Sequence, residues 1–301
     1  IQGMGLEKGK APEVWNLTHP DRVTAVHKSY VEAGSNILTT NTFGVNADKY
    51  DNYAELIAAA IDCAKAAARD AENVYVAFDI GPTGRMLEPL GDLSFEDAVS
   101  LYAKNIQIAV EKGVDLILIE TMNDCYETKA AVVAAKENSD LPIFVTNVYD
   151  RSGKLMTGAD PLAMIAMLEG LGVDAIGMNC SFGPDVMLEI IDKFTENCSL
   201  PLIANPNAGL PQVVNGETVY SISAEEFADY MVRLANKGVG ILGGCCGTTP
   251  AYIAATVRKT ADLPFGLPTP KQHTVVSSYI HAVTVGEQPI LIGERINPTG
   301  K

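Results

Sequence analysis

The run Leu116-Ile117-Leu118-Ile119-Glu120 has the pattern that decides the fold. It is short and apolar up to its last residue, and it begins three residues after Gly113, a residue type that commonly ends a helix. A longer segment of helical period, residues 125–138, comes after it. An apolar strand without alternation is typical of a parallel strand buried on both faces, which a helix connects to the next strand. The sequence here predicts one strand followed by one helix.

The same unit recurs along the chain. Short apolar segments predict seven strands, at residues 36–40, 74–80, 116–120, 143–148, 175–179, 202–204 and 240–242. Segments of helical period predict eight helices, at residues 21–33, 51–71, 94–112, 125–138, 160–171, 184–196, 223–236 and 250–260. This order predicts a (β/α)8 TIM barrel whose first strand is missing from the chain, because residues 1–20 have the pattern of a loop. A doubly wound open sheet is the alternative, but no glycine-rich phosphate-binding sequence follows an early strand.

The sequence changes character after residue 262. Prolines at positions 264, 268, 270 and 289 interrupt the segment 263–289, which predicts an interdomain linker. Ile290-Leu291-Ile292-Gly293 then has the pattern of a new strand. We therefore expect a barrel domain over residues 1–262, a linker over 263–289 and the start of a following domain over 290–301.

The composition disfavours several classes of protein. Lys and Arg total 22 against 37 Asp and Glu, and the formal net charge of −15 would repel a nucleic-acid backbone. No apolar run approaches the roughly 20 residues that span a bilayer, and the first residues lack the pattern of a secretory signal. Six cysteines in 301 residues are too few for a disulfide scaffold. These observations predict a cytoplasmic protein that binds neither nucleic acid nor membranes.

Three cysteines follow predicted strands. Cys180 comes directly after the strand at 175–179, and Cys245 and Cys246 come shortly after the strand at 240–242. Active sites of such barrels lie at the carboxyl ends of the strands, and these two strands are separated by one neighbour. Three thiolates that converge there suit zinc, which in catalytic sites commonly has three protein ligands and one open position. We therefore predict a zinc site with catalytic cysteines at the barrel mouth.

Other interpretations of the cysteines are weaker. Burial as small apolar side chains fits Cys63, Cys125 and Cys198, which lie on helices or near helix ends. A disulfide between the adjacent residues 245 and 246 would be strained. A purely structural zinc ion would need a fourth Cys or His, which no nearby CxxC or HxxxH motif supplies.

Two motifs contain the clustered cysteines, and three more lie near the start of the chain. They are Asn179-Cys180, Gly243-Gly244-Cys245-Cys246-Gly247-Thr248, Pro12-Glu13-Val14-Trp15-Asn16-Leu17, Glu32-Ala33-Gly34-Ser35 and Thr39-Thr40-Asn41-Thr42-Phe43-Gly44. Together these motifs resemble the zinc-dependent homocysteine S-methyltransferase family, over residues 1 to about 262. The resemblance implies a (β/α)8 barrel that transfers a methyl group to the thiol of homocysteine, giving methionine. A family motif with the sequence Asp-Gly-Ala-Met-Gly-Thr, whose Asp helps to hold the amino acid, is absent from this chain.

The resemblance implies a role for individual residues at matching positions. It implies that Cys180, Cys245 and Cys246 are zinc ligands, and that Glu120 holds the amino group of homocysteine. In that family a weak oxygen donor fills the fourth position of the metal until the homocysteine sulfur replaces it. Asn207 occupies the corresponding place here, and it is therefore a candidate for both metal and substrate binding.

The last residues indicate the source of the methyl group. Residues Ile292-Gly293-Glu294-Arg295-Ile296-Asn297-Pro298-Thr299-Gly300 resemble the opening of the folate-binding barrel that follows this module in cobalamin-dependent methionine synthases. That resemblance implies methylcobalamin as the methyl donor, recharged from methyltetrahydrofolate, with folate- and cobalamin-binding domains of the same full-length protein as partners. Two alternatives are a stand-alone enzyme that uses betaine or S-methylmethionine, and a zinc module without catalysis.

Overall fold

A curled parallel sheet forms the centre of the computed structural model, which describes residues 1–7, 9–214, 217–265, 268–272, 274–286 and 288–289. Its seven strands lie in the order β1-β2-β3-β4-β5-β6-β9, and every neighbouring pair is parallel. The predicted seven-stranded α/β barrel architecture is confirmed. The strands are β1 (Ile37–Thr39), β2 (Tyr75–Ile80), β3 (Leu116–Met122), β4 (Ile143–Asn147), β5 (Ala175–Asn179), β6 (Leu202–Asn205) and β9 (Val239–Leu242).

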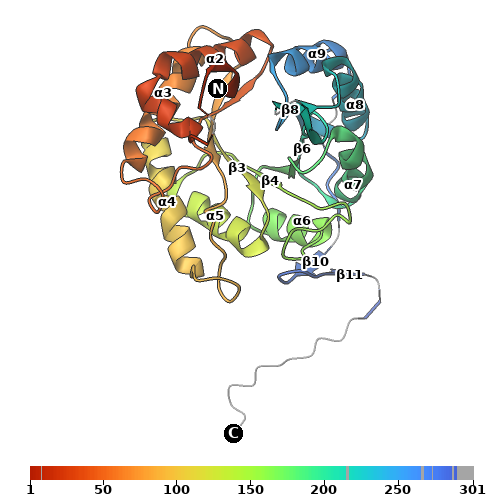
Figure 1. Cartoon of the computed structure of the whole chain (residues 1–301). Coiled ribbons are helices and arrows are strands. Elements are labelled where there is room, and N and C mark those ends of the chain that lie inside the picture. The colour runs from red at the N-terminus through yellow and green to blue at the C-terminus, as the bar shows by residue number, and fades with distance from the viewer. Residues whose placement is uncertain (8, 215–216, 266–267, 273, 287, 290–301) are drawn as a thin grey trace.

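A ring of helices surrounds the sheet (Figure 1). Several begin at a side chain that accepts the backbone N–H three residues later, as Ser94 and Asp124 do. All eight predicted helices are present: α2 (Pro20–Glu32), α3 (Tyr53–Ala68), α4 (Phe95–Glu111), α5 (Cys125–Asn138), α6 (Pro161–Gly170), α7 (Pro184–Asn197), α8 (Ala224–Asn236) and α9 (Pro250–Thr260). Short helical turns η1 (Gln2–Met4), η2 (Pro12–Val14) and α1 (Trp15–Thr18) precede them.

No helix in the described part of the chain is long and apolar enough to cross a membrane.

The sheet remains open between its two outer strands. Within the described residues, β1 pairs only with β2 and β9 pairs only with β6, so one strand is lacking for closure. The helix layer nevertheless continues across this seam, because α2 contacts α9. A cavity of about 560 Å³ lies at the seam and extends towards the barrel interior. The first-strand position predicted to be missing therefore corresponds to this seam.

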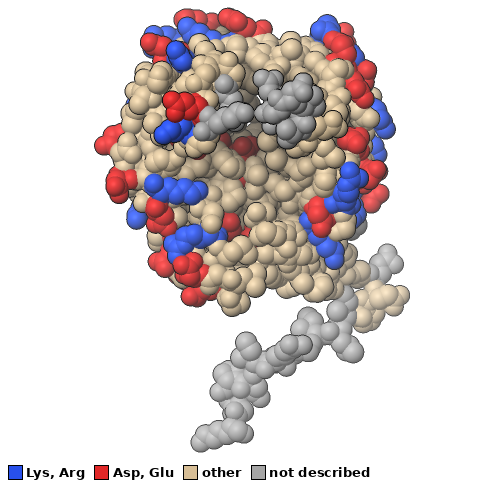
Figure 2. Space-filling model, in the orientation of Figure 1, with Lys and Arg blue, Asp and Glu red and all other residues tan. Residues whose placement is uncertain are grey.

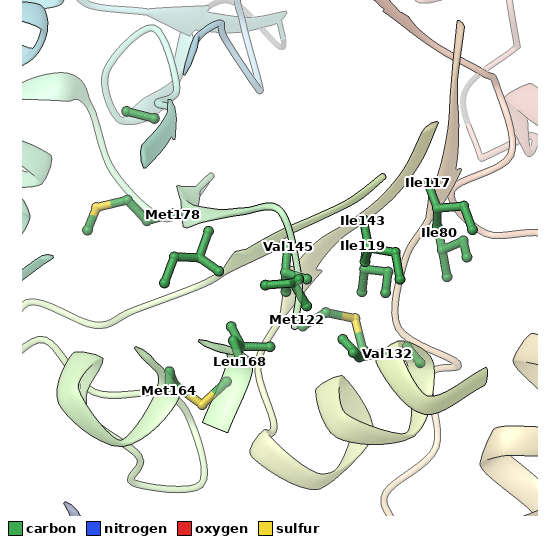
Figure 3. Packing of buried hydrophobic residues seen from close by; sticks show 14 of the residues in the cluster. Ile80, Ile117, Ile119, Met122, Val132, Ile143, Val145, Met164, Leu168 and Met178 are labelled. Carbon is green, nitrogen blue, oxygen red and sulfur yellow. The ribbon is translucent and has the colours of Figure 1, made fainter. Parts of the chain in front are cut away.

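Alternation along the strands separates two apolar layers. Ile117 and Ile119 of β3 point outwards and pack with residues of α5 and α6, as Figure 3 shows. Leu116 and Leu118 point the other way and form a separate cluster inside the barrel. Because successive side chains of a strand face opposite sides, the next even-numbered residue, Glu120, points into the barrel as well.

Two hairpins were not predicted from the sequence. The first, β7 (Pro211–Val214) with β8 (Glu217–Tyr220), follows β6. The second, β10 (Thr274–Ser277) with β11 (Ala282–Val285), lies within the segment predicted to be a linker and packs against α6. The predicted start of a following domain, residues 290–301, lies outside the described residues.

The β10–β11 hairpin, called the tail hairpin below, is attached to the barrel through its turn, residues 278–281. The hydroxyl of Tyr279 donates to Asp124, the residue that caps α5. The ring of Tyr279 also lies 4.5 Å from the ring of Tyr126, measured between centroids. These contacts hold the hairpin beside α5 and α6.

We predict that Tyr279→Phe loosens this hairpin without unfolding the barrel. The substitution removes one hydrogen bond to a carboxylate, a loss of about 1–3 kcal/mol, while the ring contact stays. Amide hydrogen exchange of residues 274–285 should therefore accelerate severalfold, and exchange in β3 and β4 should stay unchanged. Tyr75→Phe, at a half-exposed ring on β2, is the matched control. Unchanged exchange in the Tyr279 variant would contradict this account of the attachment.

Candidate metal centre

Three cysteine side chains meet at the end of the barrel where the strands terminate. Cys180 directly follows β5, and Cys245 and Cys246 follow β9, with β6 between these two strands. The Sγ atom of Cys246 lies 4.0 Å from the Sγ atoms of both other cysteines. All three sulfur atoms lie within 4.8 Å of one another.

These separations fit one tetrahedral metal ion. Sulfur ligands about 2.3 Å from zinc are roughly 3.8 Å apart at tetrahedral angles, close to the two distances of 4.0 Å. Thiolates are soft donors of the kind that zinc accepts. No fourth His, Cys or carboxylate of the described residues joins the group, so three protein ligands would leave one position open. The cluster can therefore hold a metal ion and a further ligand.

The last residue of β6 and the loop after it hold both cysteine-bearing loops. The backbone N–H of Cys180 donates to the carbonyl of Asn205 at 3.0 Å. The backbone N–H of Cys245 donates to the carbonyl of Pro206 at 2.8 Å. The consecutive residues Asn205 and Pro206 thus bond to the loops that follow the strands on either side of β6, which fixes how closely the cysteines approach.

Asn207 lies in the same loop, beside the cysteines, and is 5% exposed. Its Oδ1 accepts the backbone N–H of Cys246 at 3.0 Å, and the carbonyl of Cys246 accepts the N–H of Ala208 at 2.9 Å. An amide oxygen has two lone pairs, so Oδ1 keeps one for another partner. The predicted role of Asn207 as an oxygen ligand stays a prediction, and its hydrogen bond adds a structural role that the sequence did not indicate.

Glycines allow the turn that carries the two adjacent cysteines. Gly247 has a φ of 81°, in the left-handed region that favours glycine. A Cβ atom at this position would overlap the ring of Tyr220, at the end of β8. The β7–β8 hairpin therefore packs directly on the cysteine loop through this ring.

The three thiols change the pKa of one another. The neighbouring thiols of Cys245 and Cys246 hold the pKa of Cys180 well below its ordinary value. The nearby thiol of Cys180, followed by the thiol of Cys246 and by burial, raises the pKa of Cys245. A divalent cation would replace the thiol protons, since thiolates are the metal-binding form. The cluster thus favours bound positive charge.

Glu120 approaches the same region from β3. Burial, and after it the neighbouring Cys180, raise the pKa of Glu120 to about 7. Figure 2 shows acidic side chains inside the central hollow of this face. The structure brings this carboxyl group near Cys180, and its role in holding an amino group stays a prediction.

Two more acidic residues in this region were not predicted. Asp79 of β2 and Glu13 of η2 are both buried. Burial raises the pKa of Asp79 well above its ordinary value, and Glu120 and Glu13 raise it further. For Asp79, the sequence offered one signal, since it is an acidic residue at an inward-facing position of an otherwise apolar strand.

A pair of polar side chains joins the tips of β3 and β5. Asn179 is 1% exposed, its Oδ1 accepts the N–H of Thr121 at 2.9 Å, and its Nδ2 donates to Oγ1 of Thr121 at 2.6 Å. Thr121 and Cys180 have φ values of 61° and 58°, a conformation that costs about 1–3 kcal/mol per non-glycine residue. Because Glu120 precedes Thr121 and Cys180 follows Asn179, this pair positions both functional candidates.

Other residues considered from the sequence lie elsewhere. Cys63, Cys125 and Cys198 are buried, as expected for small apolar side chains, and none belongs to the cysteine cluster. Glu88 is exposed on the loop after β2.

We predict that Asn179→Ala weakens metal binding about 10- to 100-fold, because it releases the strand tip that carries Cys180. Competition with a chromophoric zinc chelator would measure this change. Asn138→Ala, which removes side-chain hydrogen bonds to Ala134 of α5 and to Gln107 of α4, should leave zinc affinity unchanged. Equal affinity in wild type and Asn179→Ala would show that the pair does not position Cys180.

We also predict that Glu120→Gln changes how the stability of the metal-free chain depends on pH. With a folded pKa of about 7 against an ordinary 4.5, folded Glu120 retains a proton that the unfolded chain releases between these values. Stability from this group is therefore lost as pH rises from about 4.5 to 7. Urea unfolding would give the free energy of unfolding at pH 5 and at pH 8. Its decrease between these pH values should be smaller in Glu120→Gln than in the wild type by on the order of 1–3 kcal/mol. An unchanged difference would contradict the raised pKa.

Comparisons with known proteins show the family to which the chain belongs. The sequence model of the family described as homocysteine S-methyltransferase matches residues 2–260. Methionine synthase of Mycobacterium leprae (strain TN) is 31% identical over 312 residues, which cover 96% of this chain and 26% of that protein. Methionine synthase of Mycobacterium tuberculosis (strain ATCC 25618 / H37Rv) is 30% identical over 306 residues, which cover 96% of this chain and 26% of that protein. The chain thus spans about a quarter of the length of these curated relatives.

Solved structures show the same fold. The metallated form of the homocysteine methyltransferase MmuM from Escherichia coli aligns with a TM-score of 0.72 at 21% identity, over 86% of this chain and 92% of that chain. Its apo form gives a TM-score of 0.70 at 22% identity, over 86% of this chain and 91% of that chain. The structural likeness supports the barrel, and the sequence match over residues 2–260 decides the family. This chain belongs to the homocysteine S-methyltransferase family of methyltransferase enzymes.

Proposed function

We propose that this chain transfers a methyl group to the thiol of homocysteine, giving methionine, at a zinc ion held by Cys180, Cys245 and Cys246. The observation that carries the proposal is the convergence of three sulfur atoms, at separations close to those of a tetrahedral zinc site. Membership of the homocysteine S-methyltransferase family supports the choice of substrate.

Zinc would solve the main chemical difficulty of the reaction. A free thiol has a pKa near 8.5, so only about a few per cent is thiolate at neutral pH, and the thiolate is the nucleophile. Bound zinc would lower that pKa and hold the substrate sulfur as a thiolate in the open position. Three cysteine thiolates outweigh the charge of a divalent ion, which leaves electron density on the substrate sulfur.

The remaining residues of the site would orient the amino acid. Glu120, near Cys180, would accept hydrogen bonds from the substrate ammonium group. Asn207 would offer its free Oδ1 lone pair to the metal before the substrate binds, while its bond to Cys246 keeps it in place. The bonded loop 205–208 would hold the cysteines at a constant separation throughout the reaction.

We further propose methylcobalamin as the methyl donor, presented and recharged from methyltetrahydrofolate by other domains of a longer protein. The match to methionine synthases, of which the chain spans about a quarter, supports this donor over betaine or S-methylmethionine. In this proposal residues 1–262 are the barrel domain, 263–289 connect it onwards and 290–301 begin a folate-binding domain. Free methylcobalamin, betaine and S-methylmethionine, each supplied with homocysteine and the zinc-loaded chain, would distinguish the donors by the methionine formed.

We predict that Cys246→Ser abolishes both stoichiometric zinc and methyl transfer. A serine hydroxyl does not replace a soft thiolate ligand at neutral pH. Metal analysis and methionine formation from homocysteine and methylcobalamin would be measured together. Cys63→Ser is the control, because Cys63 donates to the carbonyl of Pro20, a bond that a hydroxyl can keep. Normal methyl transfer by a zinc-free Cys246 variant would overturn the mechanism.

A further inference from the structure

The β7–β8 hairpin begins and ends beside the loop after β6, the loop that holds the cysteines in place. The backbone N–H of Ile222, just past the hairpin, donates to the carbonyl of Ala208 at 3.1 Å. Gly209 has a φ of 97°, and a Cβ atom there would meet Oγ of Ser221 at 2.6 Å. The two ends of the hairpin are therefore packed against each other, which fixes the position of its last residue, Tyr220.

The ring of Tyr220 takes the place that a side chain of residue 247 would occupy. A Cβ atom on Gly247 would lie 2.3, 2.4 and 2.7 Å from three carbon atoms of the ring. Alternation along β8 turns the neighbouring Val219 the other way, and Val219 is 45% exposed whereas Tyr220 is half-buried. The hairpin thus presents an aromatic ring to the cysteine loop.

This contact acts on the turn that carries the two adjacent cysteines. Gly247 directly follows Cys246, and its φ of 81° belongs to the turn in which Cys245 and Cys246 approach one point. Glycine has access to many other conformations, so this turn is costly in entropy unless a neighbour holds it. A ring packed on Gly247 excludes the conformations that would carry this residue outwards.

The ring also lies beside the more open side of the cysteine cluster. Cys246 is exposed, whereas Cys180 and Cys245 are partly buried. Burial, and after it the thiols of the three cysteines with Cys246 first among them, raise the pKa of Tyr220. In the view of Figure 1, β8 lies within the ring of helices. Tyr220 therefore lies next to the cysteine that solvent reaches most easily.

We propose that Tyr220 is a positioning residue of the metal centre, whose ring holds the turn at residues 245–247 in its metal-binding conformation and slows the approach of competing ligands to Cys246. This inference rests on the proposed zinc site. Side chains that orient the ligands of a metal commonly change its affinity by about 10- to 100-fold when they are removed. The ring, rather than the hydroxyl group, makes the contact with Gly247.

The rate of zinc release tests this role. The zinc-loaded chain would be mixed with excess EDTA, and the zinc that stays with the protein would be measured over time after rapid gel filtration. We expect Tyr220→Ala to release zinc about 10- to 100-fold faster than the wild type, and Tyr220→Phe, which keeps the ring, to stay within about twofold. Val219→Ala, at the neighbouring residue that faces away, is the matched control and should change nothing.

Labelling of the metal-free chain separates a contact with the turn from a general loss of stability. Iodoacetamide, with the modified residues identified by peptide mass spectrometry, should label Cys246 severalfold faster in Tyr220→Ala than in the wild type. The buried Cys63 should react as slowly as before. A variant that merely destabilises the barrel would instead expose both thiols to the reagent.

Gly247→Ala provides a second, independent test. An alanine at a φ of 81° is strained in any background, but its methyl group also overlaps the ring when Tyr220 is present. The acceleration of zinc release by Gly247→Ala should therefore be smaller in Tyr220→Ala than in the wild type. If Tyr220→Ala does not fold, Tyr220→Leu, which is apolar but lacks a flat ring, takes its place and should also release zinc faster.

The possible outcomes separate this inference from the proposed function. Zinc release at the wild-type rate from folded Tyr220→Ala, with unchanged labelling of Cys246, would show that Tyr220 does not position the turn, and the zinc site would stand. Equal acceleration in Tyr220→Ala and Tyr220→Phe would contradict the role of the ring. If the wild-type chain holds no stoichiometric zinc, the proposed function fails, and the inference fails with it.

Discussion

The hydrogen bonds made by residues 205–208 are the interaction on which the metal centre depends. Cys180 and the Cys245–Cys246 pair follow strands with β6 between them, so their strands are about 10 Å apart. Their sulfur atoms, in contrast, are separated by little more than the edge of a zinc tetrahedron. Residues 205–208 hold the two cysteine loops close together, because they form hydrogen bonds with the backbone of both. The metal site is therefore assembled by the middle strand, which contributes none of the three thiols.

Charge is distributed unevenly between the surface and the interior. Exposed ion pairs such as Arg85 with Asp48 are screened by water and contribute little to stability. Inside the barrel, the three thiols, Glu120 and Asp79 raise or lower the pKa of one another, and no lysine or arginine lines the cavity among the described residues. The interior therefore favours ligands that bring positive charge, both a metal ion and an ammonium group.

The sequence predicted the strands well, because their local pattern is compatible with only one kind of secondary structure. Apolar segments such as 116–120 are too short for helices and lack alternation, and they became the parallel strands. Because all parallel strands in such a fold end at one edge, the order of elements also brought Cys180 and Cys245 together. The position of Glu120 inside the barrel followed from alternation once the strand was known.

Features that depend on distant contacts could not be predicted in this way. The turn of the tail hairpin, residues 278–281, contains no glycine, proline or asparagine, and prolines nearby indicated a linker instead. Asn179 was noticed as part of a motif, but its partner Thr121 is 58 residues away in sequence. Asp79 had the pattern of a single polar residue in an apolar strand, and only the surrounding cavity shows that its oxygen is unpaired.

The attachment of Tyr279 also has a mechanical consequence. Asp124, which accepts its hydroxyl, lies only four residues beyond Glu120, and α5 starts at the next residue. A force applied to the tail hairpin would thus be transmitted to the end of β3 through a very short length of chain. The tension would reach Thr121, whose side chain is bonded to the residue before Cys180. The β10–β11 hairpin and the barrel mouth are therefore mechanically connected through Asp124 and the end of β3.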